Sequence, residues 1–284
     1  MVEPMGVYSS VPSVRAKRCV RKMKGGAQAH LLETDDGAYV VKFFNNPQGH
    51  RILTNEFVSS LLMQALGLMT PEIAVVTVPD GFEDGSEISI IHSTGRKERP
   101  TGVHFGSRYP GTPGAFSIYD FLPDKLLLEV VNLEQIWGAL VFDKWVSNAD
   151  ARQAIFHRAR ISLPGNSEVD GSVRWIAKLV DNGHAFQHRD WCFRDSPVQG
   201  LYGRRAVYNA VTSLRSFECW FDPLFALGRE HLEAITGLLP PEWIAGEEPE
   251  LRRMLNRLLV RRRDVPGLVE ESLDWLEQRS RQES

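Results

Sequence analysis

The order of apolar and polar positions divides the chain into a strand-rich first part and a helix-rich second part. Short apolar or alternating runs predict five strands, at residues 20–23, 27–32, 38–44, 71–78 and 87–91. The Asp36-Gly37 turn marks a hairpin between the second and third of these strands. Apolar residues at helical spacing from Phe57 to Leu66 predict one helix, which Gly67 ends. Residues 93–115, rich in Gly, Pro, Arg and Thr, are expected to form a long irregular loop.

Beyond Pro123 the pattern becomes mainly helical. Asn132 and Gln135 have the spacing of a capping box for a helix that covers residues 133–146. Two strand-like runs at 154–162 and 172–180, separated by turn-forming residues, predict one β-hairpin within this second part. The sequence therefore predicts an α+β protein with a strand-rich N-terminal region and a helical C-terminal region.

Composition narrows the class of protein. The 284 residues are 43% hydrophobic and 24% charged, as in ordinary soluble globular proteins. A net charge of −3 argues against direct nucleic-acid binding, because duplex binders carry large positive patches. The three cysteines lack metal-ligand spacing and are expected to be reduced. The sequence shows neither a membrane-spanning run nor a signal peptide, so we expect a cytoplasmic protein without membrane contact.

Two carboxylates stand at the ends of the predicted hairpin. Asp150 closes an apolar helix-like run, and Asp181 closes a strand-like run about thirty residues later. A hairpin returns the chain to its origin and would bring both acids to one mouth. One base and one metal ligand are what phosphoryl transfer to a hydroxyl needs. Each acid taken singly also fits an ordinary loop or turn residue, and Asp143, expected along the helix side, competes with Asp150.

A lysine, a glutamate and a glycine pair add to this chemistry. Lys42 interrupts an apolar strand and either faces solvent or contacts the phosphates of a nucleotide. Glu56, expected in the first turn of the following helix, either favours the helix dipole or orients Lys42. Gly25 and Gly26 form either a simple hairpin turn or a loop that lets the backbone approach phosphate.

Taken in order, these segments resemble the HipA-like kinases, distant relatives of protein kinases and phosphoinositide kinases, and especially a bacterial stand-alone subgroup. The resemblance runs from about residue 20 to residue 225. The motifs that carry it are Gly26-Ala27-Gln28, Val40-Val41-Lys42-Phe43, Asn55-Glu56-Phe57, Trp145-Val146-Ser147-Asn148-Ala149-Asp150 and Leu179-Val180-Asp181-Asn182-Gly183-His184-Ala185-Phe186.

The resemblance implies a bilobal kinase fold, with an N-lobe at residues 1–122 and a C-lobe at residues 123–284. The N-lobe would hold an antiparallel sheet with one helix, and the C-lobe would be mostly helical with a catalytic hairpin. It also implies ATP as the phosphate donor and magnesium as the metal. The residues that would contact ATP in the N-lobe are Gly26, Ala27, Gln28 and Lys42, with Lys42 paired to Glu56.

The remaining roles follow from the same resemblance. Residues 116–122 would form the hinge between the lobes, where the backbone of Tyr119 and Phe121 would contact adenine. Asp150 would be the base, or the group that orients the attacking hydroxyl. Asp181 would bind magnesium. The acceptor would be a hydroxyl of a protein Ser or Thr, or of a small molecule. Toxin-type members of the family have an antitoxin partner, but nothing in the C-terminal region of this chain indicates one.

One position departs from the family pattern. These kinases usually place an asparagine, the second magnesium ligand, five residues after the catalytic aspartate, where this chain has Ile155. We hypothesise that Gln153 replaces it as metal ligand and catalytic-site residue, while Asn148 is an alternative that approaches from the other side. If the second metal site is lost instead, the chain would be a weak kinase, a nucleotide-binding pseudokinase or a transferase of another nucleotide moiety.

Overall fold

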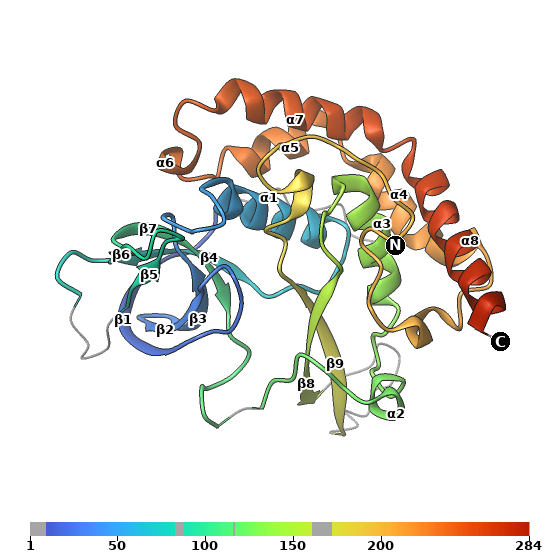
Figure 1. Cartoon of the computed structure of the whole chain (residues 1–284), viewed down its shortest axis with the longest axis horizontal. Coiled ribbons are helices and arrows are strands. Elements are labelled where there is room, and N and C mark those ends of the chain that lie inside the picture. The colour runs from blue at the N-terminus through green and yellow to red at the C-terminus, as the bar shows by residue number, and fades with distance from the viewer. Residues whose placement is uncertain (1–9, 83–87, 116, 161–171, 284) are drawn as a thin grey trace.

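A closed five-stranded barrel forms the first part of the structure (Figure 1). The computed structural model describes residues 10–82, 88–115, 117–160 and 172–283. The barrel strands are hydrogen-bonded in the order β1-β2-β3-β7-β4, with β1 and β4 parallel and the other pairs antiparallel. Their bounds are β1 Ser13–Lys22, β2 His30–Thr34, β3 Gly37–Lys42, β4 Ile73–Val78 and β7 Gly102–Arg108.

The predicted irregular loop at residues 93–115 is wrong, because this range contains β7, one of the five strands of the barrel. Strand β7 pairs with β3 on one side and β4 on the other. Its Gly106 faces packed side chains, where an added Cβ atom would come within 2.4 Å of the Val76 side chain. The glycine therefore allows close packing inside the barrel rather than a flexible loop. The short strands β5 (Ile90–Ile91) and β6 (Lys97–Glu98) precede it, while the start of the strand predicted at 87–91 lies outside the described residues.

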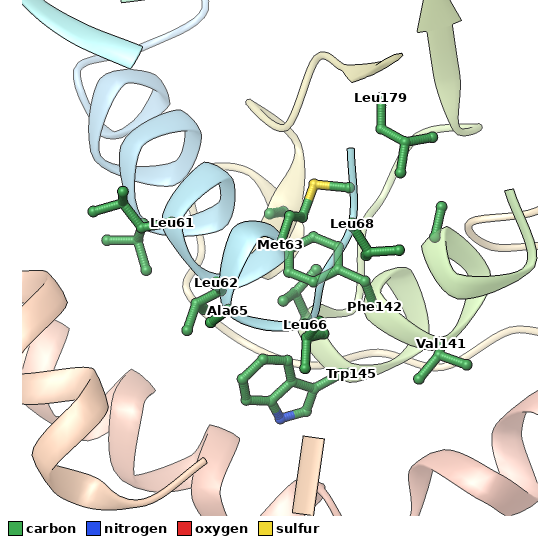
Figure 2. Close-up of a cluster of buried hydrophobic side chains, with 14 of the residues drawn as sticks. Leu61, Leu62, Met63, Ala65, Leu66, Leu68, Val141, Phe142, Trp145 and Leu179 are labelled. Carbon is green, nitrogen blue, oxygen red and sulfur yellow. The ribbon is translucent and has the colours of Figure 1, made fainter. Parts of the chain in front are cut away.

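Helix α1 (Arg51–Ala65) lies between the barrel and the C-terminal helices (Figure 1). Gly67, in the left-handed conformation, follows its end as predicted. The helix is buried on almost every side, because the barrel covers one face and the C-terminal helices cover others. Figure 2 shows Met63 of this helix in one apolar cluster with Phe142, Trp145 and Leu179. Its position is thus fixed from several directions.

The predicted hairpin of the second part is confirmed. Strands β8 (Gln153–Arg160) and β9 (Val173–Val180) pair antiparallel from Gln153 opposite Val180 to Arg160 opposite Val173. The predicted turn between them, residues 163–171, lies outside the described residues. Asp150 precedes β8 and Asp181 follows β9 in the chain, so this register places both residues at the same end of the hairpin.

The rest of the second part is helical (Figure 1). The α-helices are α2 Asp124–Leu127, α3 Gln135–Val146, α4 Glu218–Ala226, α5 Arg229–Thr236, α6 Pro241–Ile244, α7 Glu248–Arg261 and α8 Val265–Glu283. The 3₁₀ turns are η1 Ala185–Gln187, η2 Arg205–Tyr208 and η3 Leu214–Phe217. The predicted α+β class is therefore confirmed. Among the described residues, no helix combines the length and apolar character needed to span a membrane.

The predicted capping box before α3 is wrong. The helix begins at Gln135 without a side-chain cap. The Asn132 amide instead binds the backbone of Ala177 in β9, donating to its carbonyl at 2.9 Å and accepting from its N–H at 2.8 Å. The Gln135 side chain accepts a hydrogen bond from the Met69 N–H at 2.6 Å. Both residues thus join α3 to neighbouring segments, a tertiary role that their spacing along the chain does not reveal.

The apolar core does not follow a boundary near Pro123. One cluster fills the barrel, whereas α1 and Phe105 of β7 share a second cluster with α3, β9 and the C-terminal helices. The division into lobes at residues 1–122 and 123–284 stays a prediction. The shared core attaches α1 to the C-terminal region as well as to the barrel.

His104 makes the stability of the barrel sensitive to acid. Its imidazole is 1% exposed, and Nδ1 accepts a hydrogen bond from the Phe44 N–H at 3.0 Å. Burial lowers its pKa to about 3. The unfolded chain, with an ordinary pKa of about 6.5, binds a proton that the folded chain does not, so stability falls as pH drops from about 6.5 toward the folded pKa.

We therefore expect the melting temperature of His104→Asn to fall less steeply than that of the wild type between about pH 6.5 and 4. Asparagine can keep an acceptor near the position of Nδ1, but it does not titrate. Thermal unfolding followed by circular dichroism across this range tests the expectation. Burial also lowers the pKa of His157, so the variant should keep a shallower slope rather than become pH-independent. Equal slopes in both proteins would contradict this role of His104.

Candidate active site

A cavity of about 360 Å³ is bounded by the barrel, α1 and the base of the β8–β9 hairpin. One part of its wall is apolar and comes from both halves of the chain. This part is formed by Ala29, Val40, Phe105, Ile118, Ile155 and Leu179. The other part carries most of the charge and the hydrogen-bonding groups. It is formed by Lys42, Glu56, Asp150, Gln153, Asp181 and His184. A site of this size with a few convergent polar groups suits a small ligand with one apolar and one ionic end.

The ionic end is organised by Lys42. The Lys42 side chain is 12% exposed and forms ion pairs with Glu56 of α1 and, at 2.8 Å, with Asp181 after β9. Burial alone would lower the pKa of Lys42, but the charges of Glu56 and Asp181 outweigh it and raise that pKa. Burial would raise the pKa of Asp181, but Lys42 holds it down at about 2. Lys42 and Asp181 are therefore both charged at neutral pH.

Two alternatives that the sequence left open for these residues are excluded by burial. Lys42 does not face solvent, since it lies beside Val40 on the cavity side of β3. Glu56 is not an exposed acid in a first turn, because α1 begins at Arg51 and Glu56 is only 3% exposed. Its second oxygen accepts a hydrogen bond from the Asn182 N–H at 3.1 Å. Glu56 therefore binds both Lys42 and the segment that follows Asp181.

The backbone of Asp181 is held in an unfavourable conformation. Its φ of 63° is left-handed, which costs a residue other than glycine about 1–2 kcal/mol. The ion pair with Lys42 and the contact between Glu56 and Asn182 hold the chain on both sides of this bend. Such a conformation at a cavity is typical of a functional residue.

Asp150 lies at the same cavity on an exposed loop between α3 and β8. Its Oδ1 accepts a hydrogen bond from the Ala151 N–H at 2.8 Å, and its own N–H donates to Asn148 Oδ1 at 3.3 Å. Asn148 is fully buried, and its amide nitrogen donates to Asp143 at 2.9 Å. Because both ends of the Asn148 amide are engaged in this loop, the structure does not support Asn148 as a metal ligand. Gln153 does reach the cavity.

A buried ion pair between Asp143 and Arg152 fixes this loop, and sequence reasoning missed it. Asp143 does not lie on an open helix side but has no exposed side-chain surface, and neither has Arg152. Arg152 binds both oxygens of Asp143 and also donates to the Val180 carbonyl at 3.0 Å and to Asn182 Oδ1 at 2.9 Å. An acid inside the apolar run 139–146 needs a buried partner. The need of Asp143 for a buried partner is therefore the feature of the sequence from which this ion pair could have been predicted.

Some residues with predicted roles lie elsewhere. Gly26 and Ala27 line the cavity, but the Gln28 side chain instead binds Lys22 and the backbone of Ile91. The left-handed backbone of Gln28 (φ 49°) belongs to the turn before β2. The glycine-containing turn is thus at the site, whereas the Gln28 side chain is used to hold β5.

Within the predicted hinge at residues 116–122, Ile118 lines this cavity, whereas Tyr119 and Phe121 do not. The backbone N–H and carbonyl of Tyr119 both pair with Phe156 of β8, and Phe121 is 57% exposed beside the Arg204 guanidinium. The first residue of the predicted hinge, Phe116, is outside the described residues. Residues 107–110 also line the cavity. The hinge at residues 116–122, and the contact of Tyr119 and Phe121 with adenine, stay predictions.

The oxygen donors at the cavity suit a magnesium ion that is shared with a ligand. The described residues contain no group of three or more His, Cys, Asp or Glu side chains able to hold a metal. Asp181 and Gln153 supply a carboxylate and an amide oxygen, the hard donors that magnesium prefers. Magnesium is commonly bound by one or two protein oxygens together with phosphate oxygens and water. The residues present fit that mode of binding.

Two solved structures with a similar fold are kinases. The Helicobacter pylori proinflammatory kinase CtkA superposes with a TM-score of 0.53 and 14% identity, covering 93% of this chain and 99% of that chain. The Golgi casein kinase superposes with a TM-score of 0.51 and 11% identity, covering 93% of this chain and 73% of that chain. At these identities the likeness shows the fold, and the predicted kinase-like fold is confirmed.

The family follows from the sequence itself. A model of the HipA-like kinase family matches residues 17–163, more than half of the chain, so the chain belongs to that family. The matched segment includes Lys42, Glu56, Asp150 and Gln153. The resemblance predicted from the motifs is thus confirmed, while the roles of the individual site residues stay predictions.

The buried pair predicts an asymmetric effect on stability. We expect Asp143→Asn to lower the free energy of unfolding by about 3–5 kcal/mol, because it leaves the Arg152 charge buried without a counter-charge. Urea unfolding measures this loss. The control is Glu277→Gln, which breaks the exposed pair with Arg281 and should cost no more than about 1 kcal/mol. Similar small losses in both variants would contradict a structural role for the buried pair.

Proposed function

We propose that this protein is a phosphotransferase that uses ATP and magnesium to transfer the γ-phosphate to a hydroxyl group. The observation that carries the proposal is the meeting of Lys42, Glu56 and Asp181 at the ionic end of a cavity whose other walls are apolar. Asp150 lies at the same cavity from another element. Membership of the HipA-like kinase family supports this proposal.

The two kinds of wall suit the two ends of a nucleotide. Val40 and Leu179 belong to the apolar part and would enclose the base from the barrel side and the hairpin side. Gly25 and Gly26 line the cavity as well, and glycines let backbone amides approach phosphate oxygens closely. Lys42, oriented by Glu56, would contact the phosphates as a fixed positive charge.

Asp150 would act on the acceptor hydroxyl. Its carboxylate is exposed at the cavity, while its backbone is fixed through Asn148 to the buried Asp143. This arrangement lets a substrate reach the carboxylate without letting the loop change shape. Asp150 would accept the hydroxyl proton or orient the hydroxyl for attack on the phosphorus.

Asp181 and Gln153 would hold the metal ion. When bound, magnesium neutralises charge on the phosphate oxygens and helps to orient them for transfer. The low pKa of Asp181 keeps its carboxylate ionised and ready for a cation over the whole physiological range. Gln153 would supply a neutral oxygen from the first position of β8.

Ile155 favours a second candidate, in which a nucleotide binds without γ-phosphate transfer or a different nucleotide moiety is transferred. Ile155 lines the cavity at the position where the family usually has its second metal ligand, and its side chain has no oxygen donor. A weakened metal site would lower the rate of phosphoryl transfer more than the affinity for the nucleotide. The experiment must therefore follow the fate of each phosphate.

The test is incubation of the wild type with γ-labelled and, separately, α-labelled ATP and magnesium, with label on the protein and on released phosphate both measured. We expect γ-label to be transferred to protein or water, and Asp150→Asn to reduce this by about 10²–10⁴-fold. Glu250→Gln on α7, which neutralises an exposed acid paired with Arg253, should leave transfer unchanged. Transfer of α-label would indicate nucleotidylation, and binding without transfer would indicate a pseudokinase.

The Gln153 hypothesis makes a separate prediction about the metal. Gln153→Ala should raise the magnesium concentration for half-maximal turnover by about tenfold or more, because it removes an oxygen ligand. Ile155→Asn restores an oxygen at the usual family position and should lower that concentration. Magnesium titrations of ATP turnover give both values. Full metal-dependent turnover in Gln153→Ala would show that Gln153 is not a ligand.

A further inference from the structure

The segment after Asp181 follows an unusual path that needs support. Phe186, Gln187 and His188 have φ values of 57°, 57° and 60°, and Trp191 has a φ of 47°. Each left-handed residue other than glycine costs about 1–2 kcal/mol. A run of such residues persists only where surrounding contacts determine it. Several of the contacts that do so converge on one side chain of α1.

That side chain is Asn55, which precedes Glu56. It has no exposed surface, and the two hydrogens of its amide nitrogen are shared among the carbonyls of Gly183 at 2.9 Å, Ala185 at 3.1 Å and His188 at 2.8 Å. Its amide oxygen accepts a hydrogen bond from the Trp191 indole at 2.8 Å. A carboxylate of the same size has no N–H group to donate, and an apolar side chain can neither donate nor accept. Only the amide can therefore make all these contacts.

Trp191 is itself held from outside. The Arg51 guanidinium lies over its ring, 4.1 Å from the centroid, and also donates to the Arg189 carbonyl. The same guanidinium binds both oxygens of Glu247, at 2.9 and 3.0 Å. Arg51 begins α1, so the segment is attached to this helix at two successive turns.

We propose that Asn55 is a positioning residue that presents Asp181 to the metal, an inference that rests on the proposed function. Adjacent residues of α1 would then have complementary tasks. Glu56 orients Lys42, and Asn55 fixes the carbonyls that immediately follow the metal ligand. Because Gly183 is only two residues from Asp181, a shift of this carbonyl moves the carboxylate. Loss of such outer contacts typically reduces metal affinity or activity by about 10–100-fold.

The test compares Asn55→Ala and Trp191→Phe with the wild type. The probe is Mn²⁺ with ADP, and electron paramagnetic resonance measures the free ion. We expect Asn55→Ala to weaken Mn²⁺ binding by about 10–100-fold and to speed amide hydrogen exchange in residues 182–190. Trp191→Phe keeps a ring for Arg51 but leaves the Asn55 oxygen without its donor, so it should show a smaller change of the same kind.

Two controls separate positioning from general stability. Ser59→Ala alters another buried residue of α1 that does not line the cavity, and it should leave Mn²⁺ binding and exchange unchanged. Asn132→Ala removes a different buried amide, which holds β9 at Ala177, and should lower the melting temperature without weakening Mn²⁺ binding. If Asn55→Ala behaves like Asn132→Ala, the positioning role is overturned.

The outcome also separates this inference from the proposed function. A wild type that binds Mn²⁺ with ADP but transfers no phosphate would overturn the phosphotransferase proposal and leave the role of Asn55 standing if the variant binds more weakly. Unchanged Mn²⁺ affinity and exchange in Asn55→Ala, with phosphate transfer by the wild type, would overturn the inference alone. A wild type that does not bind Mn²⁺ with ADP would overturn both.

Discussion

The arrangement of this molecule depends on the burial of one ammonium group. Removing a charge from water costs several kcal/mol unless opposite charges and hydrogen bonds compensate it. Lys42 stands on the barrel, and its two counter-charges come from α1 and from the end of the hairpin. Separating any of these three elements would leave a charge buried without its partner. The ion pairs therefore fix the relative positions of the barrel, the helix and the hairpin at the point where the cavity forms.

A second buried charge extends the same constraint to the loop that carries Asp150. Arg152 and Asp143 compensate each other, and Arg152 also binds Asn182. Asn182 in turn donates its backbone N–H to Glu56, the partner of Lys42. The two buried ion pairs are thus joined through a single residue beside Asp181. One connected set of polar contacts orients both acids that phosphoryl transfer would require, and the apolar core around α1 excludes water from its inner side.

The sequence revealed those features that depend on local pattern or on a conflict between a residue and its surroundings. Two strand-like runs separated by turn-forming residues predicted the β8–β9 hairpin, and a lysine inside an apolar strand marked Lys42. Asp143 is likewise a charged residue inside an apolar run. Its partner Arg152 lies outside that run, and nothing in the sequence around Arg152 indicates that it is buried; only the fold shows this. Strand β7 was missed because it lies in a range whose composition, rich in glycine and proline, is typical of loops. Gly106 is in this strand because it has no side chain that would collide with Val76.

Strand geometry limits how closely the metal side of this site can match the rest of the family. Gln153 and Ile155 are two positions apart on one strand, so both face the cavity, but they are separated by about 6.6 Å along β8. The longer glutamine side chain recovers only part of that distance. A metal held by Gln153 would therefore lie nearer to the Asp150 loop than one held by an asparagine at position 155. Such a shift would alter how the ion neutralises charge on the phosphates, while the walls for the base would stay the same. The chain would thus keep the nucleotide-binding half of a kinase site and differ in the half that controls transfer.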